Sequence, residues 1–219
     1  MELLSLVLVN ISSPIPVNLS TSLRYVDLSA TYMRGVLPES LFLVPNSLEN
    51  LRLSDNHLLK GVLPKIHASN TALLELDISN TGISGCQLSG SIPDSIGNLT
   101  QITELDLSYN HFTDYIPSTI SKFKHLTRLD LSSNSFSGEI PDVFSNLPQL
   151  RNLYLNDNSF IGSFPSSVLN LTQLDTLDLS SNSLSGPLPG NTSMLPKLTE
   201  LVLSYNSLNG TVRPAIYLI

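Results

Sequence analysis

Residues 126–141 read LTRLDLSSNSFSGEIP, and this stretch decides the fold. Its leucines at 126, 129 and 131 and its asparagine at 134 return three times at an unbroken spacing of 24 residues. The returning blocks are Leu150-Leu153-Leu155-Asn158, Leu174-Leu177-Leu179-Asn182 and Leu198-Leu201-Leu203-Asn206. A period of this length indicates a solenoid in which each repeat forms one turn.

Each turn is expected to contribute one short parallel strand. The end of the pattern L-x-x-L-x-L alternates, so Leu129 and Leu131 point to one side while Asp130 points to the other. One strand cannot bury its leucines alone, so the turns must stack and share a core. The pattern therefore predicts an α/β leucine-rich repeat solenoid, with parallel strands on the concave face and irregular, 3-10 or short helical segments on the convex face.

The asparagine that ends each strand predicts a ladder of bends inside the stack. Backbone N–H and C=O groups buried at a bend need partners, and an Asn amide is both donor and acceptor. The expected ladder is Asn56, Asn110, Asn134, Asn158, Asn182 and Asn206, with Thr31 replacing Asn in one turn and either Thr81 or Cys86 in another.

Towards the N-terminus the repeats are less even. Ile102-Leu105-Leu107-Asn110 belongs to the 24-residue series, and the earlier blocks begin at Leu23, Leu48 and Leu73, which gives steps of 25, 25 and 29 residues. We expect a single domain over residues 1–219, with about eight turns from 23 to 212. Residues 1–22 are interpreted as a degenerate first turn whose strand uses Leu3, Leu6 and Leu8. The alternative for residues 3–9 is a secretory signal, which the negative Glu2 disfavours.

The 29-residue step places an irregular junction near residues 81–92. Two versions of the segment that follows a strand stand back to back there, TGISG at 81–85 and CQLSGSIP at 86–93. One interpretation is that about nineteen residues of an ancestral turn are missing; the alternative is a loop insertion of about five residues.

Composition excludes several function classes. The net charge is −7, with 11 Lys and Arg against 18 Asp and Glu, so no basic stripe can neutralise phosphates and we expect no nucleic-acid partner. The single cysteine, Cys86, excludes an intrachain disulfide and hence cysteine caps. No stretch approaches the roughly 20 apolar residues that span a bilayer. Membrane attachment is therefore expected only through a span outside this chain.

Enzyme motifs are missing from the sequence. It contains no G-x-S-x-G elbow, no glycine loop for phosphates and no H-x-x-x-H pair. The histidines fall in different turns or in different parts of a turn. We therefore expect no catalytic residue, no metal site and no cofactor.

Ligand binding is expected on the outward positions of the strands, which form rows of side chains about 4.8 Å apart. The middle row reads Asp27, Arg52, Asp77, Asp106, Asp130, Tyr154, Asp178 and Val202. Aspartate is the template residue there and is interpreted as structural, so Arg52, Tyr154 and Val202 are the informative departures.

Tyrosine and arginine on the neighbouring rows complete the predicted site, because both are favoured interface anchors. The predicted ligand-binding residues are Arg52, Tyr109, Arg128, Arg151, Asn152, Tyr154, Asp157, Val202 and Tyr205. The best patch within this set is formed by Arg128, Arg151, Asn152, Tyr154 and Asp157. The alternative is that Glu104 and Arg128 only pair across strands and that the rest is solvated surface.

Six Asn-x-Ser/Thr sequences are candidate N-glycosylation sites. They begin at Asn10, Asn18, Asn98, Asn170, Asn191 and Asn209. Asn98 and Asn170 are the better candidates, because both fall at the same point of their turns and away from the strand.

The template L-x-x-L-x-L-S-x-N-x-[LF]-S-G-x-[IL]-P resembles the plant-specific class of leucine-rich repeats. Within that class, GVLPKIH at 61–67, LDISNTGISG at 76–85 and GSIPDSIGNLT at 90–100 resemble the ectodomains of receptor-like proteins in plant immunity, of the Cf disease-resistance type. The resemblance implies recognition of a protein or peptide on the extracellular side of the cell membrane. It also implies a co-receptor kinase as a partner of the full-length receptor. Because such proteins carry caps and a membrane span, we interpret this chain as an internal piece of one.

Two alternatives remain at this point. The first is a soluble inhibitor of a secreted enzyme, similar to the polygalacturonase-inhibiting leucine-rich repeat proteins. The second is a truncated gene copy without function. Flanking coding sequence for a membrane span would favour the receptor.

Overall fold

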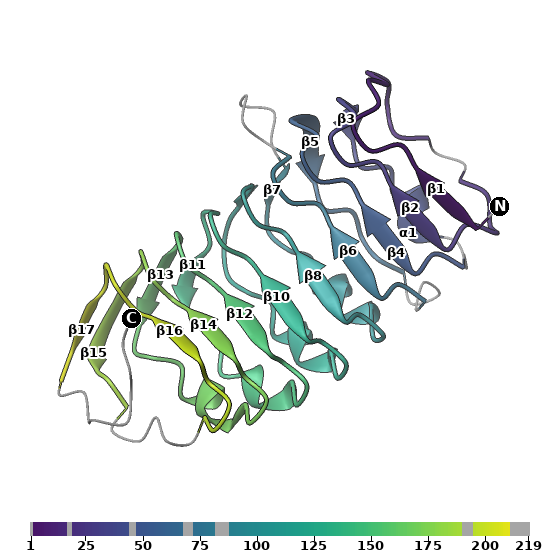
Figure 1. The fold of residues 1–219 in the computed structure, drawn as a ribbon. Helices are drawn as coiled ribbons and strands as arrows, with labels where there is room; N and C mark the ends of the chain where they lie inside the picture. Colours follow the sequence, from purple (N-terminus) through teal and green to yellow (C-terminus); the bar gives the residue numbers. More distant parts are fainter. Residues whose placement is uncertain are drawn as a thin grey trace.

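The computed structural model describes residues 2–16, 19–43, 47–67, 72–81, 88–189 and 195–210. Short parallel strands stack in sequence order from the N-terminal to the C-terminal end, one for each turn (Figure 1). Within these ranges the main sheet has nine strands: β1 (Leu3–Ser5), β2 (Tyr25–Asp27), β4 (Asn50–Arg52), β6 (Glu75–Asp77), β8 (Glu104–Asp106), β10 (Arg128–Asp130), β12 (Asn152–Tyr154), β14 (Thr176–Asp178) and β16 (Glu200–Val202). The predicted leucine-rich repeat solenoid is confirmed.

Every strand of the main sheet pairs in register with its neighbours. Leu129 of β10 lies between Leu105 of β8 and Leu153 of β12. These three leucines are fully buried. The middle residue of each strand therefore points into the core, and the first and third residues form outward rows on the concave face.

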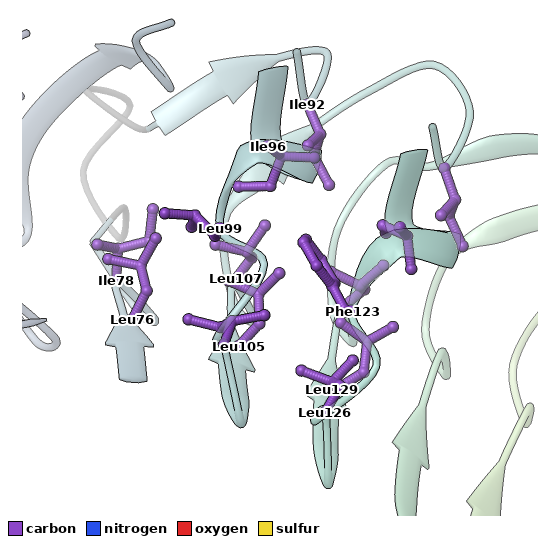
Figure 2. Close-up of a cluster of buried hydrophobic side chains, with 14 of the residues drawn as sticks. Leu76, Ile78, Ile92, Ile96, Leu99, Leu105, Leu107, Phe123, Leu126 and Leu129 are labelled. Carbon is purple, nitrogen blue, oxygen red and sulfur yellow. The ribbon is translucent and has the colours of Figure 1, made fainter. Parts of the chain in front are cut away.

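The core is filled from both sides of the stack. Figure 2 shows leucines of the strands, such as Leu105 and Leu129, packing towards Ile96 and Phe123 from the opposite side of each turn. That side carries the short helices, as the repeat pattern predicts: α1 (Ser40–Leu43), η1 (Asp94–Asn98), η2 (Ser118–Lys122), η3 (Phe144–Asn146) and η4 (Ser166–Asn170).

A second set of short strands follows the main strands, and the repeat pattern did not predict it. One group is β3 (Arg34–Val36), β5 (Leu58–Val62), β7 (Leu88–Gly90) and β9 (His111–Phe112); the other is β11 (Ser137–Glu139), β13 (Ser159–Gly162), β15 (Ser183–Pro187) and β17 (Ser207–Asn209). Phe112 of β9, Phe136 just before β11 and Phe160 of β13 form a stack in which neighbouring ring centroids are 6.2 Å apart.

The asparagine ladder is confirmed. Asn134 donates from Nδ2 to the carbonyl oxygen of Leu107 at 2.9 Å in the preceding turn and to that of Ser132 at 3.0 Å in its own turn. Its Oδ1 accepts a hydrogen bond from the backbone N–H of Phe112. The same pattern recurs at Asn158, Asn182 and Asn206.

Threonine replaces asparagine at two bends. Thr31 donates from Oγ1 to the carbonyl oxygen of Leu28 at 2.7 Å, and its backbone N–H donates to Oδ1 of Asn56 at 3.2 Å. Thr81 donates to Oδ1 of Asn110 at 2.5 Å and is fully buried. Thr81 therefore occupies the bend for which the sequence offered either Thr81 or Cys86. Cys86 lies outside the described residues.

The first strand has a different register from the one expected. Strand β1 pairs in parallel with β2 so that Leu4 lies opposite Val26. Leu4 and Leu6 pack against the core, whereas Leu3 and Leu8 are 59% and 78% exposed. The expected use of Leu3 and Leu8 was wrong, because two leucines in succession fit either alternation and the pairing with β2 selects Leu4.

The 29-residue step forms one turn of the stack. Strand β6 pairs directly with β8, and β7 pairs with both β5 and β9. Residues 82–87 lie outside the described residues. The missing-segment and insertion interpretations of this junction therefore both stay hypotheses.

Candidate functional site

The aspartates of the middle row are the third residues of their strands, and each forms hydrogen bonds that stabilise the end of its strand. Asp130 accepts hydrogen bonds at Oδ1 from the backbone N–H of Ser132 at 3.0 Å and from its hydroxyl at 2.6 Å. The same pair of bonds joins Asp77 to Ser79, Asp106 to Ser108 and Asp178 to Ser180. The structural interpretation of this row is confirmed.

Arg52 takes the place of such an aspartate in β4 and makes other contacts. Its Nε donates to Oε1 of Glu75 at 2.5 Å, and its guanidinium carbon lies 5.7 Å from the centre of the Tyr25 ring. Glu75 also accepts a hydrogen bond from Nδ2 of Asn50 at 2.7 Å. The hydrogen bond to Glu75 raises the pKa of Arg52 above its ordinary value. Arg52 is thus a fixed positive charge on the concave face.

Arg128 and Tyr154 are brought together, as the predicted patch requires. The Arg128 guanidinium carbon lies 4.6 Å from the centre of the Tyr154 ring, within the range of a cation–π contact. Its Nη2 donates to Oδ2 of Asp130 at 2.7 Å and lies 3.6 Å from Oδ2 of Asp106. The alternative pairing of Arg128 with Glu104 is not found, although the two residues are opposite in register.

A polar hollow of about 210 Å³ lies between the two arginines. It is lined by Arg52, Glu75, Leu76, Asp77, Glu104, Asp106 and Arg128, which come from β4, β6, β8 and β10. Burial and, after it, the nearby charge of Asp130 raise the pKa of Asp106 to about 6, against hydrogen bonds from Ser108 that lower it. The hollow therefore contains a carboxyl whose pKa is raised above its ordinary value.

The sequence prediction missed the acidic residues of this hollow. Glu75 lies opposite Glu104, and Asp77 lies opposite Asp106, on adjacent strands. Such like-charged pairs could have been found by aligning the strand positions of neighbouring repeats. Asp77 and Asp106 do stand next to each other in the middle row of the sequence, but that row was interpreted as structural only.

Strand β12 carries the rest of the predicted patch. Arg151 is exposed immediately before the strand, and Asn152 and Tyr154 are half-buried on it. Asp157 is exposed beyond the strand and accepts a hydrogen bond from Nδ2 of Asn156 at 2.9 Å. Val202, on β16, is half-buried and lies two strands away.

Tyr109 and Tyr205 occupy an unusual backbone position at the edge of this face. Their φ angles are +54° and +55°, and their side chains are 62% and 84% exposed. Other turns place Asp55, Ser133 or Asp157 at the equivalent position with a similar φ. A bulky residue in this left-handed region is rare, so both tyrosines are held in a conformation that their side chains disfavour.

The glycosylation candidates differ in their surroundings. Asn10, Asn170 and Asn209 are exposed. Asn98 is half-buried, and its Nδ2 donates to the carbonyl oxygen of Ile66 at 2.8 Å. Asn18 and Asn191 lie outside the described residues.

Neither a membrane-spanning helix nor a metal-binding cluster is present in the described part of the chain. No helix there has the length and apolar character that crossing a bilayer requires. Nor do three or more histidine, cysteine or acidic side chains gather there in a way that could hold a metal ion.

The sequence matches family patterns described as Leucine rich repeat at residues 100–160 and, for a second pattern of this description, at residues 72–99 and 173–195. It is 43% identical to Receptor-like protein 6 of Arabidopsis thaliana over 101 residues, which cover 45% of this chain and 10% of that protein. It is 37% identical to Receptor-like protein Cf-9 of Solanum pimpinellifolium over 100 residues, covering 45% of this chain and 11% of that protein. The chain thus matches about a tenth of the length of these relatives.

The fold is also similar to that of a solved plant receptor. The crystal structure of the Arabidopsis receptor kinase HAESA, in complex with the peptide hormone IDA and the co-receptor SERK1, superposes with a TM-score of 0.80 at 40% identity. The match covers 89% of this chain and 31% of that chain.

Proposed function

This chain belongs to the leucine-rich repeat proteins of the plant receptor-like type, and we propose that its concave face recognises a peptide or protein ligand as part of a cell-surface immune receptor. One observation carries the proposal. Most turns use their middle outward residue to fasten the strand end, whereas β4, β12 and β16 present Arg52, Tyr154 and Val202 there instead. These side chains are thereby available for contacts beyond the repeat.

The surface around β12 is the main contact surface that we propose for the ligand. Tyr154 is held by the guanidinium of Arg128, so its ring is pre-oriented and loses little freedom on binding. Arg151 and Asp157 add exposed charges of opposite sign. An aromatic centre with a charged rim is the usual composition of a binding hot spot.

The proposed partners and location rest on the receptor-like similarity. We propose that the chain acts on the extracellular side of the cell membrane, within a longer receptor that carries the membrane span, and that a co-receptor kinase joins the complex. The solved complex of HAESA with a peptide hormone and a co-receptor supports this class of partners. The immune part rests on the Cf-type resemblance, and N-linked glycans at exposed sites such as Asn170 would suit that location.

The test is a selection of binding peptides on the full chain, produced through a secretory route. A phage library of random dodecapeptides would be enriched on the immobilised chain and its binders measured on variants. We expect Arg151→Ala and Tyr154→Ala to weaken binding by roughly 5- to 30-fold, which is the loss typical of interface anchors. Lys122→Ala, an exposed change at the end of η2 on the convex side, is the control and should leave binding unchanged. Binders that are indifferent to Arg151 and Tyr154 would reject the proposal.

A further inference from the structure

Like charges lie opposite each other in the middle of the concave face. Glu75 of β6 faces Glu104 of β8, and Asp77 faces Asp106, in the register of a parallel pair. Asp106 in turn faces Asp130 of β10. Like charges directly opposite on adjacent strands destabilise a sheet. This part of the sheet therefore carries an unfavourable concentration of negative charge.

Two arginines border this region without neutralising it. Arg52 is bonded to Glu75, and Arg128 is bonded to Asp130 and stacked on Tyr154. Among the described residues, no basic side chain lies within 4.0 Å of a carboxylate oxygen of Glu104. The same holds for Asp77, whose Oδ1 accepts hydrogen bonds from Ser79. The carboxylates between the two arginines thus keep an excess of negative charge.

The space between the arginines can hold a side chain. Its volume of about 210 Å³ is several times the roughly 30 Å³ that one water molecule occupies in the liquid. Its lining side chains are charged, and Glu104 is exposed at its edge. A guanidinium group matches the negative charge of this lining.

We propose that this acidic hollow, lined by residues of β4, β6, β8 and β10, binds an arginine side chain of the peptide ligand. The inference rests on the concave-face function proposed above and specifies the ligand chemistry. Arginine fits better than lysine, because its planar group donates up to five hydrogen bonds and can engage two carboxylates at once. The two fixed arginines at the borders would repel a cation that lies next to either of them. A bound cation is therefore expected between β6 and β8.

The titration of Asp106 supports this assignment. Its pKa is raised to about 6, first by burial and then by the charge of Asp130. Arg128 lies 3.6 Å away but is committed to Asp130 at 2.7 Å. A bound cation would supply the missing favourable charge and lower the pKa of Asp106.

The test uses a small probe and the full chain labelled with ¹⁵N. N-acetyl-arginine methylamide is titrated against the chain, and N-acetyl-citrulline methylamide serves as a neutral probe of nearly the same shape. We expect the arginine probe to shift the amide resonances of β6 and β8 with an affinity on the order of millimolar, and the citrulline probe to bind at least several-fold more weakly. Equal shifts from both probes would overturn the proposal.

A matched pair of variants tests whether the arginine probe binds in the acidic hollow. Glu104 and Glu200 both stand first in their strands and both are exposed, but only Glu104 lines the hollow. Glu104→Gln should weaken the arginine probe by roughly 3- to 10-fold, whereas Glu200→Gln should leave it unchanged. An equal response of the two variants would also overturn the proposal.

The inference and the proposed function can fail separately. If selected peptides depend on Tyr154 but show no enrichment of arginine, and the arginine probe does not bind, the acidic hollow is rejected while concave-face recognition stands. If the probe binds the hollow but no selected peptide depends on Arg151 or Tyr154, the peptide-receptor function is rejected.

Discussion

The side-chain amide of Asn134 donates a hydrogen bond to the carbonyl oxygen of Leu107, 2.9 Å away in the preceding turn. The oxygen of the same amide accepts from the backbone N–H of Phe112, also in that turn. One side chain therefore joins two turns through both ends of its amide. The groups that it satisfies lie at the bend behind buried leucines, where water is a poor replacement.

Replacing this asparagine is expected to be costly. Asn134→Ala leaves several backbone groups without partners and should lower the free energy of unfolding by about 2–4 kcal/mol. Urea unfolding of the full chain, followed by far-UV circular dichroism, measures the change. Ser135→Ala, an exposed neighbour, is the control and should stay within about 0.5 kcal/mol of the parent. Equal effects of the two changes would contradict the ladder.

The stack of phenylalanines predicts a graded response to side-chain size. Phe136 lies between Phe112 and Phe160, with ring centroids 6.2 Å away on each side, and is fully buried. Phe136→Ala should cost about 3–5 kcal/mol through the cavity that it leaves. Phe136→Leu should cost about 1 kcal/mol, because leucine fills most of the space and Leu184 holds the equivalent position two turns later. Comparable losses for both variants would show that the stack is not closely packed.

Much of the fold could be predicted, because the repeat carries its own chemistry. The inward leucines follow from alternation, and Asn134 follows from the hydrogen bonds that a bend requires. The register of β1 could not be predicted, because Leu3 and Leu4 are both apolar and only pairing with β2 distinguishes them. The second set of strands was missed, because its segments are short and are interrupted by glycine and proline.

The candidate site was predicted less completely. Tyr154 stood out because it departs from the aspartate of its row, and its neighbour Arg128 is indeed in contact with it. The repeat spacing does not predict which carboxylate pairs with Arg128. Glu104, Asp106 and Asp130 all lie on the same two adjacent strands, and side-chain packing decides between them. The acidic hollow was missed because its aspartates were interpreted only as structural residues of their row, although the sequence places Asp77 next to Asp106 there.

The contact between Arg128 and Tyr154 should be measurable as a coupling energy. A double-mutant cycle with Arg128→Met and Tyr154→Leu cancels the other losses of each change, including those at Asp130. We expect a favourable coupling of about 0.5–1 kcal/mol, because the guanidinium lies 4.6 Å from the ring centre at a partly exposed site. Urea unfolding of the four proteins supplies the cycle. Additivity within about 0.3 kcal/mol would mean that the contact contributes nothing to stability.

Asp106 should make the stability of the chain depend on pH. Its pKa is raised from 3.8 to about 6 on folding, so the folded state holds the proton more tightly than the unfolded state. The associated stability is fully present below about pH 4 and is lost as the pH rises through about 6. The amount lost is on the order of 1–3 kcal/mol.

Asp106→Asn isolates this effect, because the amide oxygen can still accept the hydrogen bonds from Ser108 while the charge is removed. Relative to the parent, the variant should gain about 1–3 kcal/mol between pH 4 and pH 7.5, measured by urea unfolding across that range. Asp178→Asn is the matched control. Asp178 makes the same bonds to Ser180 but lies opposite Tyr154 and Val202 instead of other carboxylates. A gain that does not change with pH, or one that Asp178→Asn reproduces, would show that the like-charged register of β6, β8 and β10 does not control the ionisation of Asp106.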